Sequence, residues 1–168
     1  MKVLIFSDSH GFLSHMTDAI DREEPDALIH LGDCTDDVEE LEIMYPTLPI
    51  YRVRGNNDFE RKNPPRAVVE LEQVPIYMTH GHRERITLLS YGQVPQNAYE
   101  NGCRLAFYGH THCALLADVH GVIVCNPGSI SLPRDGMPSY ARLLLKDGRI
   151  QRLSICEKNG SVEQEMRE

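Results

Sequence analysis

Five short segments rich in Asp, Asn and His recur along this 168-residue chain, each directly after an apolar run that is typical of a β-strand. They are residues 8–10, 32–33, 55–58, 80–82 and 109–112. Carboxylate oxygens and imidazole nitrogens are the ligands that hard or borderline divalent metals prefer. A single D-x-H or H-x-H pair is weak evidence, but five such segments at successive strand ends predict a two-metal hydrolytic site.

Within these segments, Asp8 and His10 supply an oxygen and a nitrogen to one ion from a single turn. We expect their side chains to point the same way, as residues two apart in an extended segment do. His110 and His112 repeat this arrangement. An isolated Gly-Asp pair is more often a turn with a helix cap, but beside the other segments Asp33 is the natural carboxylate to bridge two ions.

The elements expected to position these residues begin with apolar runs at residues 2–6, 27–31 and 50–53. A helix with a Ser14 N-cap, ending before Pro25, is predicted between the first two strands. A second helix, with Asp36 and Glu39 as a capping pair, is predicted before the third. This β-α-β-α-β order predicts parallel strands, whose carboxyl ends border the ligand crevice in open α/β sheets.

The rest of the chain predicts further strands at residues 67–71, 76–79 and 105–108, and one or two helices over residues 86–101. Short strands are expected from residue 115 to 155, with a hairpin turn at residues 146–149. We therefore predict an α/β fold of two packed, mixed sheets with helices outside. A single domain over residues 1–168 is expected, with a frayed tail over residues 157–168.

Composition and charge disfavour several classes of binding partner. The formal net charge of −8 makes long nucleic acid a poor partner, since such binding needs clustered Lys and Arg. No apolar run approaches the ~18 residues of a membrane span, and the first strand is too short for a secretory signal. Five cysteines without C-x-x-C spacing indicate reduced, mostly buried thiols. We expect a cytoplasmic protein that acts on a small molecule, with no membrane partner.

The order D-x-H, G-D, G-N-x-D, H-G-H, G-H-T-H resembles that of the calcineurin-like metallophosphoesterases, in particular their small bacterial and archaeal phosphodiesterases. Residues 126–129 (Asn-Pro-Gly-Ser), followed by residues 132–134, resemble a further hallmark of that subgroup. The resemblance covers residues 1 to about 155. It implies a four-layer sandwich of two sheets flanked by helices, with the metal site at the carboxyl ends of the strands.

The resemblance also implies a division of the metal ligands. One ion would be bound by Asp8, His10 and His112, and the other by Asn56, His80 and His110, with Asp33 bridging both. Three further residues are candidates for a direct part in catalysis: Asn57, Asp58 and His82. Asp58 would orient a metal ligand by hydrogen bonding, and His82 lies beside His80 without being a necessary ligand. Structural roles are expected for three other histidines, His15, His30 and His120.

Two departures from the wider superfamily matter. Many members have His directly after the metal-binding Asn, where it is thought to assist the leaving group, whereas this chain has Asn57. In the protein Ser/Thr phosphatases an Arg-containing signature follows the G-D pair, whereas residues 33–37 here contain no cation. The second departure makes a phosphoprotein substrate less favoured.

The expected activity is hydrolysis of a small phosphodiester by in-line attack of a hydroxide that bridges two divalent ions. Two such ions carry four positive charges, of which Asp8, Asp33 and the hydroxide remove three, leaving about one to attract a phosphate. The ligand set favours Mn(II), with Zn, Fe and Ni as alternatives. Rival interpretations are a phosphomonoesterase and a non-catalytic scaffold, as for the member of this fold in the retromer complex. The sequence leaves a homo-oligomer open.

Overall fold

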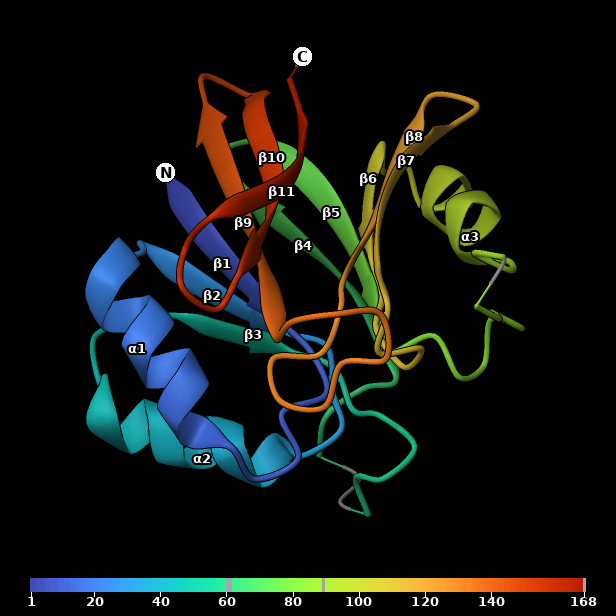
Figure 1. Cartoon of the computed structure of the whole chain (residues 1–168). Coiled ribbons are helices and arrows are strands. Elements are labelled where there is room, and N and C mark those ends of the chain that lie inside the picture. Colours follow the sequence, from blue (N-terminus) through green and yellow to red (C-terminus); the bar gives the residue numbers. More distant parts are fainter. Residues whose placement is uncertain (60–61, 89, 168) are drawn as a thin grey trace.

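The computed structural model describes residues 1–59, 62–88 and 90–167 (Figure 1). Within these residues the helices are α1 (Leu13–Glu23), α2 (Thr35–Met44) and α3 (Val94–Glu100). The strands of the first half are β1 (Lys2–Phe6), β2 (Ala27–His30), β3 (Ile50–Arg52), β4 (Arg66–Leu71) and β5 (Val74–Thr79). Those of the second half are β6 (Leu105–Phe107), β7 (Ala114–Val119), β8 (Val122–Pro127), β9 (Ser139–Lys146), β10 (Arg149–Glu157) and β11 (Val162–Met166).

The strands form two mixed sheets. The first sheet has the order β11-β10-β9-β1-β2-β3, and the second has the order β4-β5-β6-β8-β7. In the first sheet β1, β2 and β3 are parallel, as the β-α-β-α-β pattern predicted, and β9, β10 and β11 add antiparallel strands. In the second sheet β5, β6 and β8 are parallel. Several parallel strands of both sheets therefore end at the same side of the molecule.

The two sheets pack face to face, and alternate residues of each central strand serve different cores. Val3 and Ile5 of β1 belong to the core between the sheets, whereas Leu4 and Phe6 pack beneath α1 and α2. A third core lies between the second sheet and α3. Full burial of each large apolar side chain contributes roughly 1.5–3 kcal/mol. The predicted four-layer α/β sandwich is confirmed, with α1 and α2 outside one sheet and α3 outside the other (Figure 1).

The helix starts differ from expectation. The N-cap residue of α1 is Phe12, so Ser14 does not cap this helix. The N-cap residue of α2 is Cys34, whose side chain makes no capping hydrogen bond. Among the described residues of the region predicted as one or two helices, Val94–Glu100 alone is helical. Pro95 occupies the first turn, where its missing N–H costs no hydrogen bond. Residue 89 lies outside the described residues, and those around it form turns that include a Thr87–Ser90 bridge.

The expectation of a frayed tail is wrong for residues 162–166. These residues form β11, which pairs antiparallel with β10 at the edge of the first sheet. Arg152 and Glu165 add an ion pair at 3.5 Å between the two strands. A polar segment carries little hydrophobic signal, yet its backbone hydrogen bonds to β10 do not depend on apolar side chains. Residue 168 lies outside the described residues.

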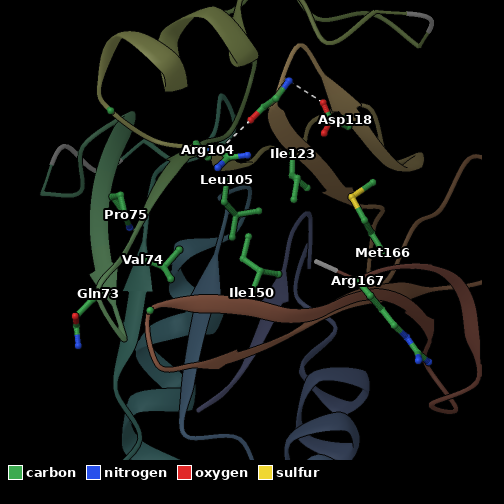
Figure 2. A pocket seen from close by; sticks show the side chains of 13 residues that line it. Gln73, Val74, Pro75, Arg104, Leu105, Asp118, Ile123, Ile150, Met166 and Arg167 are labelled. Carbon is green, nitrogen blue, oxygen red and sulfur yellow. Dashed lines mark hydrogen bonds between the residues drawn. The ribbon is translucent and has the colours of Figure 1, made fainter.

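A cavity of about 310 Å³ lies away from the predicted metal ligands (Figure 2). Val74, Leu105 and Ile150 contribute apolar walls, and Arg104 and Asp118 lie at its edge. The lining comes from the β4–β5, β7–β8 and β9–β10 hairpins, the segment around the start of β6 and the end of β11. Among the described residues, no helix is long and apolar enough to cross a membrane.

Candidate metal centre

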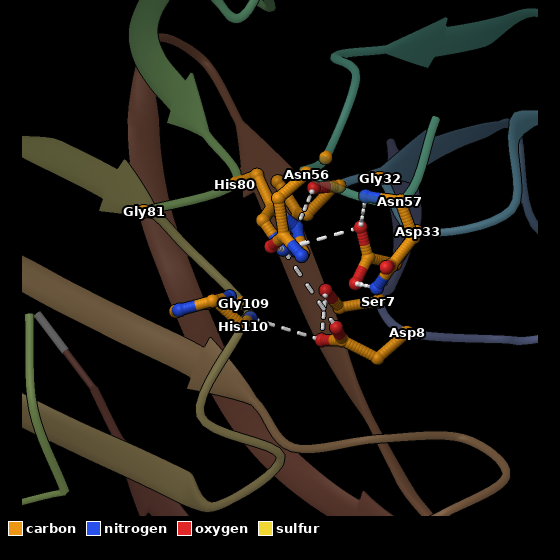
Figure 3. A network of polar contacts seen from close by, with 12 residues as sticks. Ser7, Asp8, Gly32, Asp33, Asn56, Asn57, His80, Gly81, Gly109 and His110 are labelled. Carbon is orange, nitrogen blue, oxygen red and sulfur yellow. Dashed lines mark hydrogen bonds and ion pairs between the residues drawn. The ribbon is translucent and has the colours of Figure 1, made fainter. Parts of the chain in front are cut away.

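The carboxyl ends of strands from both sheets bring the predicted ligands together (Figure 3). Asp8, His10 and His112 offer ligand atoms that all lie within 4.8 Å of one another, and Asp8, Asp33 and His80 form a second such group. The rings of His80 and His110 are also neighbours, with centroids 5.1 Å apart. The two groups share Asp8, so its carboxylate lies between the two parts of the centre.

Asp8 is fully buried, and its two oxygens have different surroundings. Oδ2 accepts hydrogen bonds from Ser7 Oγ at 2.6 Å and from the His110 backbone N–H at 3.0 Å. Oδ1 accepts none within the described part of the chain, and it faces Nε2 of His112 at 3.3 Å and Nε2 of His80 at 3.9 Å. Burial raises the pKa of Asp8, but contacts with His112, His80 and Ser7 outweigh it and lower the pKa. An anionic oxygen without a hydrogen bond, aimed at imidazole nitrogens, fits a metal ligand.

Two imidazoles are oriented by backbone carbonyls. His80 Nδ1 donates to Leu31 O at 2.8 Å, and His112 Nδ1 donates to Leu132 O at 2.7 Å. Since a carbonyl only accepts, each neutral ring must carry its proton on Nδ1 and present the lone pair of Nε2. Metal-binding histidines are generally oriented in this way.

The Nε2 atoms of these two rings converge on other potential ligands. His112 Nε2 lies 3.4 Å from His10 Nε2, and His80 Nε2 lies 3.1 Å from Asn56 Oδ1. In the neutral His80 ring the second contact sets two lone pairs face to face, which a cation between them would stabilise. Contact with Asp8 raises the pKa of His112 and outweighs burial, whereas burial and His80 lower the pKa of His110.

Asp33 belongs to the second group, its Oδ2 also lies 3.9 Å from His10 Nε2 of the first, and Asn57 holds its carboxylate. The backbone N–H of Asn57 donates to Asp33 Oδ1 at 2.9 Å, and its Nδ2 donates to Oδ2 at 2.6 Å. The approach is close: a Cβ on Gly55 would lie 2.0 Å from Asp33 Oδ1. The glycine of the 55–58 segment is therefore needed for space. Asn57, predicted at the leaving-group position, directly orients the carboxylate that is the bridging candidate.

Asp58 fixes the loop that carries Asp33. Its Oδ2 accepts from the N–H groups of Asp33 and Gly55 at 2.9 and 2.7 Å, and its Oδ1 accepts from those of Cys34 and Thr35, both at 2.8 Å. Burial raises the pKa of Asp58, but these four hydrogen bonds outweigh it and lower the pKa. Asp58 thus caps the start of α2 from a distant part of the chain and orients the Asp33 backbone.

His82 lies beside the centre. Its ring centroid is 5.5 Å from that of His80 and 6.3 Å from that of His110. Arg83 Nε donates to its Nε2 at 3.3 Å, so the neutral ring carries its proton on Nδ1, which is buried and has no hydrogen bond within the described residues. Burial, followed by the charges of His80 and Arg83, lowers the pKa of His82 to about 4.

The backbone at these positions is not extended. Five predicted ligands have positive φ angles: Asp8 (55°), His10 (45°), Asp33 (59°), His110 (67°) and His112 (59°). The expectation that Asp8 and His10 converge because their segment is extended is therefore wrong, since left-handed turns place them. Left-handed conformations of non-glycine residues cost of order 1–3 kcal/mol each and cluster at functional sites.

The structure also identifies residues that sequence reasoning missed or placed only as structural. Ser7 holds Asp8 Oδ2, as described above. His30, buried in β2, accepts from the Gly32 N–H at 3.2 Å, and its Nε2 lies 3.0 Å from Ser9 Oγ. It therefore contacts both the 8–10 and the 32–33 segments. His120 is exposed, as predicted, and His15 bonds to Ile130 O at 2.8 Å.

Comparison with known proteins identifies the class. Residues 1–148 match the model of the calcineurin-like phosphoesterase superfamily domain. A Bacillus subtilis protein named "probable metallophosphoesterase" is 38% identical over 88% of this chain and 86% of its own length. A Methanocaldococcus jannaschii protein named "phosphodiesterase" is 28% identical over 85% of this chain and 92% of its own.

The fold agrees with this assignment. The crystal structure of a predicted phosphoesterase from Streptococcus pneumoniae superposes with a TM-score of 0.78 at 30% identity, covering 99% of this chain and 97% of that one. The chain belongs to the calcineurin-like phosphoesterase superfamily, and the family assigned from the order of its motifs is confirmed. It is a hydrolase of the metallophosphoesterase class, whose members need divalent metals.

Proposed function

We propose that this chain hydrolyses small phosphodiesters with two divalent ions. One ion would be held by Asp8, His10 and His112, and the other by Asn56, His80 and His110, with Asp33 bridging them. The position of Asp33 carries the proposal. Its Oδ2 lies 3.9 Å from His10 Nε2 and its Oδ1 lies 3.5 Å from His80 Nε2, so each oxygen faces one of the two ligand sets.

Bound ions of this kind lower the pKa of a coordinated water towards neutrality and stabilise the phosphoryl oxygens during in-line displacement. The residues of the chain have separate parts in this proposal. Asp8 and Asp33 neutralise two of the four positive charges, and Asn57 holds the orientation of Asp33. His82 offers a buried Nδ1–H that has no hydrogen bond within the described residues, and this group would donate to a substrate oxygen at the edge of the centre.

A diester substrate is favoured over a monoester by the charges beside the centre. A cavity of about 360 Å³ is lined by three segments: His10, the start of α2, and the loop after β3. Its lining residues are His10, Cys34, Thr35, Asp36, Asn57, Asp58 and Phe59. Among these described residues two are carboxylates and none is Lys or Arg, which suits a singly charged diester better than a doubly charged monoester. The name of the M. jannaschii relative agrees with this choice.

Mn(II) is the ion we favour. Three carboxylate or amide oxygens and four imidazoles form the proposed ligand set, without a thiolate. Mg(II) retains its waters and seldom accepts a site rich in imidazole, whereas Mn(II) accepts both kinds of ligand. Zn(II), Fe(II) and Ni(II) suit the same donors and are the alternatives to test.

Metal removal tests the proposal directly. Treatment with EDTA should abolish hydrolysis of a bis-aryl phosphodiester, and Mn(II) should restore it better than Mg(II). An aryl phosphomonoester, assayed alongside, should be hydrolysed much more slowly. Full activity of metal-free protein would exclude a metal-dependent mechanism, and preference for the monoester would favour the phosphomonoesterase alternative. A protein that binds metal but hydrolyses neither ester would favour the scaffold.

A further inference from the structure

The loop between β8 and β9, orange in Figure 1, lies against the metal centre without supplying a proposed ligand. It follows Asn126 and Pro127, the last two residues of β8, and Asn126 is fully buried. Asn126 Nδ2 donates to Gly109 O at 3.0 Å and to Thr111 Oγ1 at 2.9 Å, and its Oδ1 accepts from the Gly128 N–H at 3.0 Å. One side chain therefore links this loop to the turn that carries His110.

The same loop holds the Asp8 backbone. Ser129 Oγ donates to Asp8 O at 2.8 Å, and Ser131 Oγ donates to the same oxygen at 2.9 Å. Two hydroxyls on one carbonyl stabilise the left-handed backbone of Asp8, which has a φ of 55°. Ser129 Oγ also accepts from the N–H groups of Ser131 and Leu132, at 3.2 and 2.8 Å.

The loop then reaches His112. Leu132, whose N–H is held by Ser129, places its carbonyl 2.7 Å from His112 Nδ1. Two residues later, the Arg134 N–H donates to His112 O at 2.9 Å. The loop thus contacts Asp8, the turn of His110, and both the ring and the backbone of His112. Ser129 is central, because one hydroxyl connects the Asp8 carbonyl to the segment that orients His112.

We infer that residues 126–132 form a positioning loop that sets the metal affinity of the centre, with Ser129 and Asn126 as its principal positioning residues. The inference rests on the proposed function, in which Asp8, His110 and His112 bind metal. Loss of a partner that orients a metal ligand typically weakens metal binding 10- to 100-fold. A turn that only supports the fold would instead lower stability and leave metal affinity unchanged.

The chain offers a matched pair of serines for the test. Ser129 and Ser139 are both buried, with exposed fractions of 0% and 1%. Ser139 Oγ donates to Pro127 O at 2.7 Å, so it supports the same loop, but no hydrogen bond from its side chain reaches a proposed ligand within the described residues. Replacing either by Ala removes one buried hydroxyl. Only Ser129→Ala removes contacts with Asp8 and Leu132.

Mn(II) affinity would be measured on metal-free protein from the EPR signal of free Mn(II), with thermal unfolding in EDTA measured in parallel. Both variants should unfold at lower temperature than the parent protein. We expect Ser129→Ala to bind Mn(II) at least about tenfold more weakly, at the lower end of the range above, and Ser139→Ala to bind it like the parent. Equal affinities in all three proteins would overturn the inference.

Ser131→Ala provides a milder variant if Ser129→Ala does not fold. It removes one of the two hydroxyls on Asp8 O and leaves Ser129 in place, so a measurable loss of Mn(II) affinity, smaller than about tenfold, is expected. Parent-like affinity of Ser131→Ala would overturn the inference in that case. A parent protein that binds no Mn(II), Zn(II), Fe(II) or Ni(II) would contradict the proposed function itself, whatever the variants do.

Discussion

The two sheets contribute different kinds of ligand to the candidate centre. The ends of β1, β2 and β3, in the first sheet, lead to the three oxygen donors Asp8, Asp33 and Asn56, together with His10. The ends of β5 and β6, in the second sheet, lead to three imidazoles, His80, His110 and His112. Oxygen donors therefore lie mainly on one side of the interface between the sheets, and nitrogen donors on the other.

The two sides are also held by opposite kinds of hydrogen bond. The carboxylates accept from N–H and O–H groups, as Asp8 does from Ser7 and His110. The imidazoles donate to carbonyls, as His80 does to Leu31. Both the His110–Asp8 and the His80–Leu31 bonds cross from one sheet to the other. Each half of the centre is therefore positioned in part by the other half.

Replacing one ligand from each side tests this comparison with the largest expected effect. Asp33→Ala removes the only residue proposed to bind both ions, so binding of both should weaken and activity should fall roughly a thousandfold or more. His112→Ala should weaken one ion more than the other, because only one set contains it. Metal content of the purified variants, measured by elemental analysis, distinguishes them. Near two ions per chain in Asp33→Ala would contradict the bridging assignment.

The sequence indicated where the candidate ligands lie in the fold because each follows a strand, and all of these strands except β3 are mostly buried. A strand covered on both faces leaves a continuous apolar run, as in β1, and the polar residue that ends it is conspicuous. Parallel strands then carry these ends to one side of the sheet. The hairpin of β9 and β10 was also predicted, because the turn residues 146–149 separate two apolar runs.

The sequence could not predict contacts that depend on distant backbone. α2 is capped by Asp58, more than twenty residues away, and not by the local pair Asp36 and Glu39. The carbonyls of Leu31 and Leu132 orient two imidazoles, but every residue has a carbonyl, so no residue type signals this role. The left-handed turns at Asp8 and His10 likewise leave no compositional signal beyond the neighbouring Gly11.

The second prediction concerns Asn57, which belongs to the oxygen side. Within the described residues it bonds to Asp33 and makes no hydrogen bond to an imidazole of the second sheet. Asn cannot supply a titrating proton, and general acid assistance is worth typically 10²- to 10⁴-fold. The enzyme should therefore hydrolyse diesters with acidic aryl leaving groups far faster than alkyl diesters. Asn57→His should raise the rates of alkyl diesters selectively, by about tenfold if the imidazole reaches the leaving oxygen.

Asn57→Ala is the control, because it removes the Nδ2 bond to Asp33 and adds no imidazole. It should lower the rates for all esters by a similar factor. His82→Ala tests the competing source of a proton from the second sheet. If parent rates do not depend on leaving-group pKa, and a steep dependence arises only in His82→Ala, then His82 is the general acid. In that case Asn57 does not leave the centre without a proton donor.

The smallest expected effect concerns His30, an imidazole of the first sheet that is not among the proposed ligands. Burial, partly offset by Asp58, Asp37 and Asp8, lowers the pKa of His30 to about 4 from an ordinary value near 6.5. Its Nδ1 accepts a hydrogen bond from the Gly32 N–H. Protonation of Nδ1 would break this bond and set two N–H donors against each other. The neutral ring is therefore the form that the fold requires.

The sign of the pH dependence follows. Because the folded pKa is lower than the unfolded one, the unfolded chain binds the proton first as pH falls. The stabilisation by neutral His30 is complete above about pH 6.5 and is lost as pH falls towards 4, by up to about 3 kcal/mol. Urea unfolding of metal-free protein between pH 8 and 5 should show this decline in the parent and a flatter profile in His30→Gln. His120→Gln, which changes an exposed histidine, should keep the parent's slope. If His30→Gln keeps that slope as well, the decline belongs to other groups, and the imidazoles of the second sheet are the next to replace.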